Sequence, residues 1–165
     1  MVLNNGMRVS FPAIVLMSLS AVSCTQVQTS RLLDMADLPL KTTELPEENW
    51  KNAPLRANAQ YILYGANTKA ERELRKGDYY FLSWYDAEPQ KPARIEMQYT
   101  QAITGADVQT RAVEYNEPRE EAGSRKERFF FSGEERAKRG DIMTWKVTLY
   151  VDGKEADTLQ SFLWE

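Results

Sequence analysis

Hydrophobic and polar residues alternate along much of the chain after residue 77, which is typical of strands with one buried face. The clearest example is the segment 142–151, where one face carries Met143, Trp145, Val147, Leu149 and Val151. The same alternation runs through residues 78–85 and 94–99. We expect the apolar face of each segment to be buried, with Trp84 and Trp145 in the core.

Turn-forming residues divide the chain into seven expected strands: 60–64, 78–85, 94–99, 108–115, 128–131, 142–151 and 156–164. Asp152-Gly153, between the last two, is typical of a tight hairpin turn. Seven short strands separated by turns predict an all-β fold, a single antiparallel β-sandwich. The mixed-charge run 119–128 is expected to form a mobile loop.

Two connections between strands have the sequence of a short helical turn. Residues 68–71 and 132–135 match the capping-box pattern, in which a Ser or Thr and a Glu three residues later satisfy free N–H groups at a helix start. Each turn is followed by Gly-Asp, and Gly77 and Gly140 stand where glycine adopts the left-handed conformation after a helix. We therefore expect two short helical turns that lead into strands.

The succession of strands resembles that of immunoglobulin-like sandwiches, with Trp84 in the second strand and Trp145 in the sixth. The cysteine pair and the tyrosine corner of that family are missing, so the resemblance implies the architecture alone. We expect the sandwich domain to span residues 58–165. The proline-rich residues 24–57 are expected to form a tether and an extended lead-in with at most one edge strand.

The first 23 residues have a different character. They contain one basic residue, Arg8, and no acid, followed by an apolar run and then by small residues before Cys24. This pattern predicts a secretory signal peptide at 1–23. The apolar run is shorter than the roughly 20 residues that a membrane span needs. Translation from Met1 or from Met7 would leave such a leader.

The end of this leader, Ala21-Val22-Ser23-Cys24, resembles the lipobox of bacterial lipoprotein precursors, although Leu is usual in the place of Ala21. The resemblance implies cleavage before Cys24, acylation of its thiol and a lipid anchor in the cell envelope. Thr25 after the cysteine implies the outer membrane. The alternative is a plain secreted protein cut at the same bond. It leaves Cys24, the only cysteine, without a role.

The composition argues against most enzyme classes. The chain has no histidine, and its one cysteine is assigned to the anchor, so Ser-His-Asp and Cys-His catalysis are excluded. The remaining route is a carboxylate-dependent hydrolase, but the paired acids at 120–121 and 134–135 are adjacent in sequence and should point apart. We expect no enzyme, no cofactor and no metal. The formal net charge of −3 gives no indication of nucleic-acid binding.

Two short motifs have ordinary structural explanations. Asp152, Glu155 and Asp157 could gather around calcium, but they lack the spacing of an EF-hand loop. Residues 139–141 spell Arg-Gly-Asp, a tripeptide that integrins bind. Its Gly-Asp already fits a helix end and a strand start. We expect neither motif to define the function.

Aromatic residues remain as candidates for ligand binding. Trp50 lies in the lead-in, Trp164 lies near the end of the chain, and Tyr79 and Tyr85 lie on the opposite face from Trp84. Exposed rings of this kind suit a protein or a sugar. The alternative is that Trp50 and Trp164 only pack against the sandwich.

The sequence favours an envelope lipoprotein that displays a β-sandwich for protein–protein contact or envelope assembly. A carbohydrate-binding module is the alternative.

Overall fold

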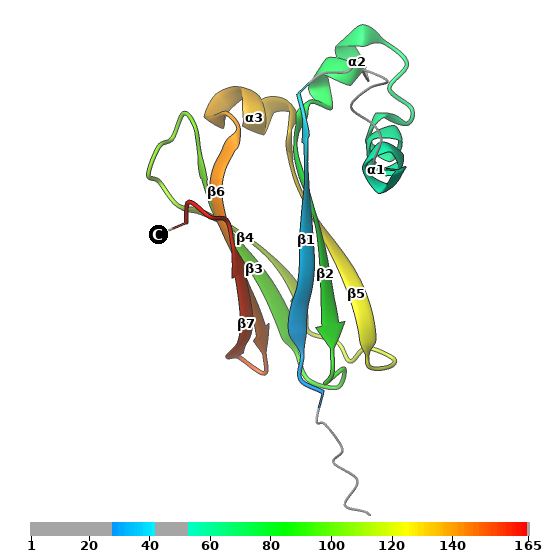
Figure 1. Ribbon diagram of the computed structural model, residues 1–165, viewed down its shortest axis with the longest axis vertical. Coiled ribbons are helices and arrows are strands. Elements are labelled where there is room, and N and C mark those ends of the chain that lie inside the picture. The colour runs from blue at the N-terminus through cyan, green and yellow to red at the C-terminus, as the bar shows by residue number, and fades with distance from the viewer. Residues whose placement is uncertain (1–27, 42–52, 165) are drawn as a thin grey trace, which may run out of the picture.

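The computed structural model describes residues 28–41 and 53–164, which form two packed antiparallel sheets (Figure 1). The first sheet has the strand order β1-β2-β5 and the second has the order β4-β3-β6-β7. The strands are β1 (Arg31–Leu40), β2 (Gly77–Asp86), β3 (Ala93–Gln101), β4 (Gln109–Tyr115), β5 (Gly123–Ser132), β6 (Ile142–Val151) and β7 (Lys154–Gln160). The predicted seven-stranded, all-β sandwich is confirmed.

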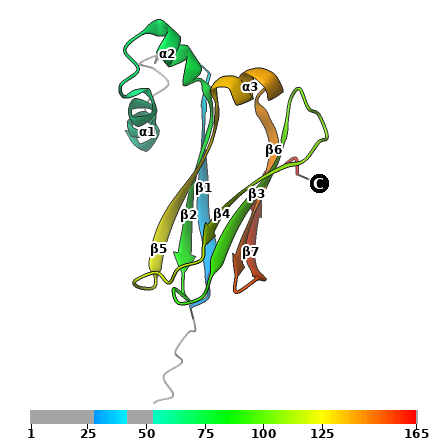
Figure 2. The same ribbon diagram turned by 180° about the vertical axis from the view of Figure 1, so that it is seen from behind.

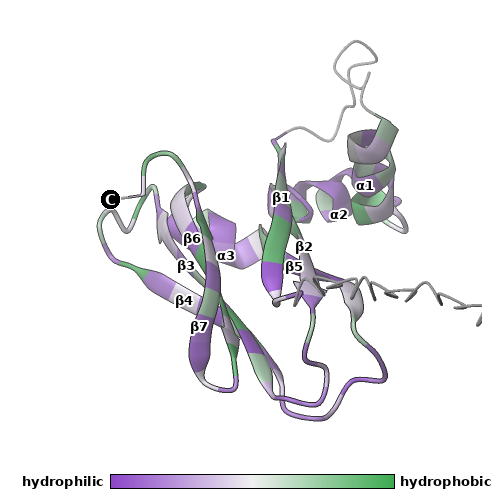
Figure 3. Cartoon of the chain, turned by 60° about the horizontal axis from the view of Figure 1, so that its bottom comes forward, coloured by the Kyte–Doolittle hydropathy of each residue, from purple (hydrophilic) through white to green (hydrophobic). Residues whose placement is uncertain are grey.

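Within residues 53–164, three short helices join this framework: α1 (Ala53–Leu63), α2 (Lys69–Leu74) and α3 (Gly133–Arg139). All three lie toward the same end of the sandwich, and α1 stands beside the β1-β2-β5 sheet (Figures 1 and 2). Figure 3 shows the two sheets as separate layers, with α1 beside the first of them. Among the described residues, no helix is long and apolar enough to cross a membrane.

The main core lies between the two sheets and has the predicted alternation. Tyr80, Leu82 and Trp84 of β2 are buried, as expected, and Trp84 is fully enclosed. They pack against the inward face of the second sheet, which includes Ile95, Met97, Tyr99, Val147 and Leu149. Alternating inward residues from both sheets are the usual core of a sandwich.

The expected strand at 60–64 is wrong, because residues 60–63 form the last turn of helix α1 and Tyr64 follows directly after it. The run of aromatic and β-branched residues there suggested a strand. The buried residues of α1, however, are Ala59 and Ile62, which are three apart and therefore share one helical face. This face packs on Leu38, Leu40 and Tyr79, on the side of the first sheet that faces away from the main core.

Strand β1 supplies the seventh strand, from within the proline-rich lead-in. It pairs with β2 from Arg31↔Tyr85 to Leu40↔Gly77 and forms an edge of the sheet. Pro39 is tolerated there because an edge strand leaves some N–H groups unpaired. A register shift between Leu32 and Asp34 turns Leu33 toward solvent.

Strand β5 begins at Gly123, so much of the charged run predicted as a loop is strand. Its inward charged residues are satisfied by partners. Arg125 Nε donates to Asp86 at 2.8 Å, and Glu127 accepts a hydrogen bond from the Tyr115 hydroxyl at 2.5 Å. Charged residues can therefore occupy inward positions at this end of the sandwich without unpaired charge.

Strand β6 departs from the expected alternation at its start. Met143 was expected in the core but is 55% exposed, because a register shift against β3 places it in a bulge. Trp145 packs edge-on against Tyr80 at a ring distance of 6.1 Å, but it is half-buried and lies at the margin of the core. Trp145 was expected in the core; it packs against that core but is only partly buried.

The predicted local motifs differ in outcome. The Thr68 capping box at α2 is confirmed in both directions, and Asp152 and Gly153 have the positive φ values of a hairpin turn, 53° and 72°. Gly140 has a positive φ of 83°, as expected.

The other expected features are not formed. Gly77 lies inside β2 and is not among the described residues with positive φ; a side chain there would meet a backbone oxygen of β5. Ser132 makes no side-chain cap bond, and the carboxylate of Glu135 pairs with Arg111.

Candidate binding site

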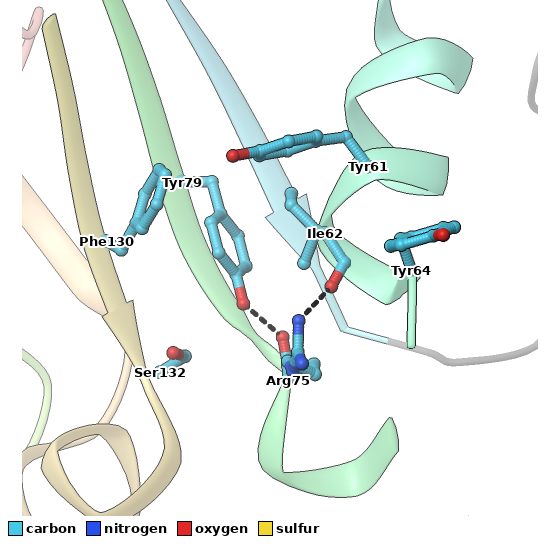
Figure 4. A pocket seen from close by; sticks show the side chains of 7 residues that line it. All are labelled: Tyr61, Ile62, Tyr64, Arg75, Tyr79, Phe130 and Ser132. Atoms are coloured by element: carbon cyan, nitrogen blue, oxygen red, sulfur yellow. Dashed lines mark hydrogen bonds between the residues drawn. The ribbon is translucent and has the colours of Figure 1, made fainter. Parts of the chain in front are cut away.

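A groove opens between α1 and the outer face of the β1-β2-β5 sheet, the face that points away from the second sheet (Figure 4). Its volume is roughly 350 Å³. The groove is lined by four aromatic rings with an aliphatic side chain, a guanidinium and a hydroxyl: Tyr61, Ile62, Tyr64, Arg75, Tyr79, Phe130 and Ser132. We call this set the aromatic groove.

The base of the groove is held by packing and by two hydrogen bonds. The Tyr79 hydroxyl donates to the carbonyl of Arg75 at 2.5 Å, and Arg75 Nη1 donates to the carbonyl of Ile62 at 2.6 Å (Figure 4). These bonds connect β2, the end of α2 and α1. Burial raises the pKa of Tyr79, so its hydroxyl stays protonated and keeps donating at neutral pH.

The walls of the groove are exposed aromatic rings. Tyr61 projects from α1 and Tyr64 from the turn directly after it, with exposed fractions of 59% and 84%, and Phe130 projects from β5 with 37%. Phe130 packs on the ring of Tyr79 at 5.2 Å, and the guanidinium of Arg128 lies 5.0 Å from the centre of the Tyr61 ring. The site therefore combines exposed aromatic surface with a cation at its rim.

The predicted candidates do not form one strip. Tyr79 is buried and contributes to the base of the groove. Tyr85 lies six residues further along β2, about 20 Å away at the rise of a strand; it is half-buried, and Arg31 lies 5.8 Å from its ring centre. Trp164 is half-buried and lies after the end of β7, which is a strand of the other sheet. Trp50 and Cys24 lie outside the described residues.

Tyr61, Tyr64 and Phe130 were not among the predicted candidates. The first two were placed in a strand whose register gave no reason to expect a shared groove. Helical spacing of Ala59 and Ile62 was the available signal, because it places Tyr61 and Tyr64 off the buried face of α1. Phe130 stands between the buried Phe129 and Phe131, and this alternation predicts that its ring points outward.

A second cluster, at the opposite end of β2, is built around a buried carboxylate. Asp86 is fully buried and accepts hydrogen bonds from Arg119 Nε at 2.5 Å and from Arg125 Nε at 2.8 Å. Arg119 also donates to the carbonyls of Glu88 and Lys91, which fixes the loop after β2. Burial alone would raise the pKa of Asp86, but the hydrogen bonds and charges of the two arginines lower it. All donors and acceptors named here pair with each other, which is typical of a structural cluster.

The Arg-Gly-Asp tripeptide is also taken up by structure. Asp141 forms ion pairs with Lys41 at 3.1 Å and with Arg136 at 2.7 Å. Arg139 donates from Nη1 to Gln109 Oε1 at 2.8 Å. The charged groups that an integrin would contact are therefore bound to neighbours within the domain.

The acidic residues considered for calcium are used separately. Asp157 accepts a hydrogen bond from the backbone N–H of Leu32 at 2.8 Å, and Glu155 accepts one from Thr158 at 3.1 Å. Within residues 28–41 and 53–164, no three Asp, Glu, His or Cys side chains group as metal ligands would.

No known protein family, curated protein or solved structure matches this chain. Its function is therefore inferred from the aromatic groove and the surfaces around it.

Proposed function

We propose that the chain is a lipid-anchored protein of the bacterial cell envelope that binds a partner protein through the outer face of its β1-β2-β5 sheet. The lipobox-like sequence that ends at Cys24 supports the anchor. Acylation of that cysteine would fix the protein to the membrane surface, since each buried CH₂ contributes about 0.8 kcal/mol. The sandwich would then act as a rigid platform held near the membrane.

The aromatic groove is the observation that supports protein binding. Aromatic residues and arginine are enriched at protein interfaces, and the residues that contribute most to affinity are usually Trp, Tyr and Arg in well-packed pockets. The groove presents Tyr61, Tyr64 and Phe130 over a base fixed by the hydrogen bonds of Tyr79 and Arg75. The base of the groove is already held by these hydrogen bonds, which reduces the entropic cost of association.

The test is to replace rings of the groove without removing its base. Tyr61→Ala and Phe130→Ala should each weaken binding to the native partner about tenfold or more, as expected for interface hot spots. Tyr150→Ala, in β6 of the other sheet, is the matched control and should leave affinity unchanged. Partners captured from the envelope by the wild type would be identified by mass spectrometry and then titrated against all three variants. Equal affinity of all the variants would contradict the proposal.

Carbohydrate binding is the second candidate, and the exposure of Tyr61 in α1 and of Tyr64 just after it favours it. Aromatic faces also stack on sugar rings, and Tyr64 is the most exposed aromatic residue of the groove. A glycan array probed with the wild type and with Tyr64→Ala separates the two functions. Glycan binding that depends on Tyr64, without capture of any protein, would favour the carbohydrate module.

A further inference from the structure

One edge of the first sheet is open. Strand β5 pairs with β2 along its whole length, from Gly77↔Ser132 to Asp86↔Gly123, and no strand of the described part of the chain pairs with its other side. On that side the carbonyl of Phe130 accepts a hydrogen bond from Arg111 Nη1 at 2.6 Å. This contact covers the β5 edge at Phe130 and leaves the stretch from Ser124 to Arg128 open.

The direction of the Phe130 carbonyl identifies which backbone groups are free. In a strand, alternate residues point their N–H and C=O groups to the same side. The outward residues are therefore Phe130, Arg128, Lys126 and Ser124, whereas the carbonyl of Phe131 points toward Gly77 of β2. Among the described residues, no backbone hydrogen bond is made by the outward groups of Arg128, Lys126 or Ser124.

The side chains along this open stretch are cationic. Lys126 and Arg128 are exposed on the outer face of the sheet, and neither forms an ion pair with any described residue. Arg128 lies against Tyr61, and Phe130 follows two residues later, so the cations lead into the aromatic groove. Backbone donors and acceptors, positive charge and apolar surface therefore follow one another along a single edge.

We propose that the edge of β5 from Ser124 to Arg128 binds an acidic, extended segment of a partner protein as an additional strand. This inference rests on the proposed role in protein binding and identifies the chemistry of the partner. Its backbone pairs with the free N–H and C=O groups. Its carboxylates lie opposite Lys126 and Arg128, and an apolar residue beyond them reaches Phe130. Strand addition of this kind takes affinity from the main chain and specificity from alternate side chains.

Charge complementarity favours this occupant over a second copy of the chain. Pairing two β5 edges would set cations against cations at cross-strand distances of about 4.5–5.5 Å, which is unfavourable. Lysine on an exposed edge also discourages nonspecific pairing. The same charges select a strand that carries carboxylates at alternate positions.

The test uses two labelled peptides, one with Glu alternating with Val and one with Lys alternating with Val, titrated by fluorescence anisotropy against the full sandwich. We expect the Glu peptide alone to bind. The double variant Lys126→Glu, Arg128→Glu should bind it about tenfold or more weakly and should bind the Lys peptide instead. Lys154→Glu, an exposed lysine of β7, is the matched control and should behave like the wild type.

Backbone pairing has its own readout. Methylating the amide nitrogens on one side of the Glu peptide removes its main-chain donors and keeps its charge, so it should abolish binding. Amide exchange of Lys126 and Arg128 should slow when the unmodified peptide is bound. Unchanged binding of the methylated peptide, or equal binding of the two unmethylated peptides, would overturn the inference. So would binding to vesicles of anionic lipid that displaces the peptide and survives the double charge reversal.

The experiments distinguish failure of the strand-addition inference from failure of the proposed function. If the Glu peptide does not bind while Tyr61→Ala still loses the native partner, the β5 edge is wrong and the aromatic groove stands. If the peptide binds as described while the groove variants keep full affinity for the native partner, the edge stands and the groove is wrong.

Discussion

Replacing Asp86 by Asn should strongly destabilise the fold, whereas the same change at Asp78 should not. Both carboxylates are buried in β2, at opposite ends of the strand. Asp86 faces two arginines, Arg119 and Arg125. Asp78 accepts a hydrogen bond from the backbone N–H of Ile142 at 2.9 Å. Comparing the two variants therefore separates two effects. Asp86→Asn measures the loss of a buried ion pair, and Asp78→Asn measures the change of a buried carboxyl group to an amide.

The magnitude follows from what each substitution leaves behind. Without Asp86, the guanidinium of Arg119, whose side chain is 8% exposed, faces an amide that carries N–H donors of its own. Breaking a buried ion pair in this way costs about 3–5 kcal/mol. Arg119 keeps carbonyl partners at Glu88 and Lys91, so we expect the lower end of that range. This is still a large share of the roughly 5–15 kcal/mol that stabilises a typical domain.

At Asp78 the amide oxygen of Asn can accept the same N–H group from Ile142. Burial raises the pKa of Asp78, which means that the native fold disfavours its ionised form. The Asn variant removes that charge and keeps the hydrogen bond. We therefore expect a change of less than about 1 kcal/mol, with either sign.

The pH dependence of the free energy of unfolding shows whether each of the two carboxylates stabilises or destabilises the fold. The pKa of Asp86 is lowered in the fold, so its contribution is complete above the unfolded value of about 3.9 and is lost as pH falls through the lower folded value. The pKa of Asp78 is raised, so its penalty develops as pH rises from about 3.9 through the higher folded value.

Urea denaturation of the wild type and both variants, followed by tryptophan fluorescence at several pH values, measures these differences. If Asp86→Asn unfolds at the same urea concentration as the wild type at pH 7, the buried ion pair does not stabilise the fold.

Four further predictions concern the core, the turns and the anchor. Trp84→Ala should cost about 3–5 kcal/mol in a urea melt, and Trp145→Ala should cost less because its ring is half-buried. Gly77→Ala should destabilise or abolish folding, because its new methyl group would overlap a backbone oxygen of β5; circular dichroism would show the loss. Thr68→Ala removes the capping box of α2 and should cost about 1 kcal/mol by the same melts. Cys24→Ser should move the protein from membrane to soluble fractions and abolish labelling by fatty acid; a membrane-bound variant would contradict the lipid anchor.

Most strands were predictable because their alternation is local and reflects burial between two layers. Residues 94–99 bury one set of alternate side chains, and the predicted inward residues of 78–85 and most of those of 142–151 are buried too, although Tyr79 and Thr148 on the opposite faces are also buried. Met143 departs from the alternation because a bulge depends on the register with a neighbouring strand, which the sequence of one strand does not contain.

The aromatic groove was not predictable in the same way. Residues 60–64 favour a strand by composition, but residues 60–63 end helix α1, where Ile62 packs with Leu38 and Tyr79. Strand β1 is likewise stabilised by its pairing with β2, despite the prolines around it. Tyr79 was selected as a ligand-binding residue by its outward position, but α1 covers it, and the exposed rings beside it belong to Tyr61 and Phe130.

Site-specific photo-crosslinking tests the central claim most directly, that the partner binds on the outer face of the β1-β2-β5 sheet. A photoreactive aromatic residue would replace Tyr61 in one variant and Tyr150 in β6 of the other sheet in a second, in cells that produce the full chain. The account predicts a cross-linked protein of defined mass from the Tyr61 position and none from the Tyr150 position. Equal cross-linking at both positions, or cross-linking at Tyr150 alone, would contradict it.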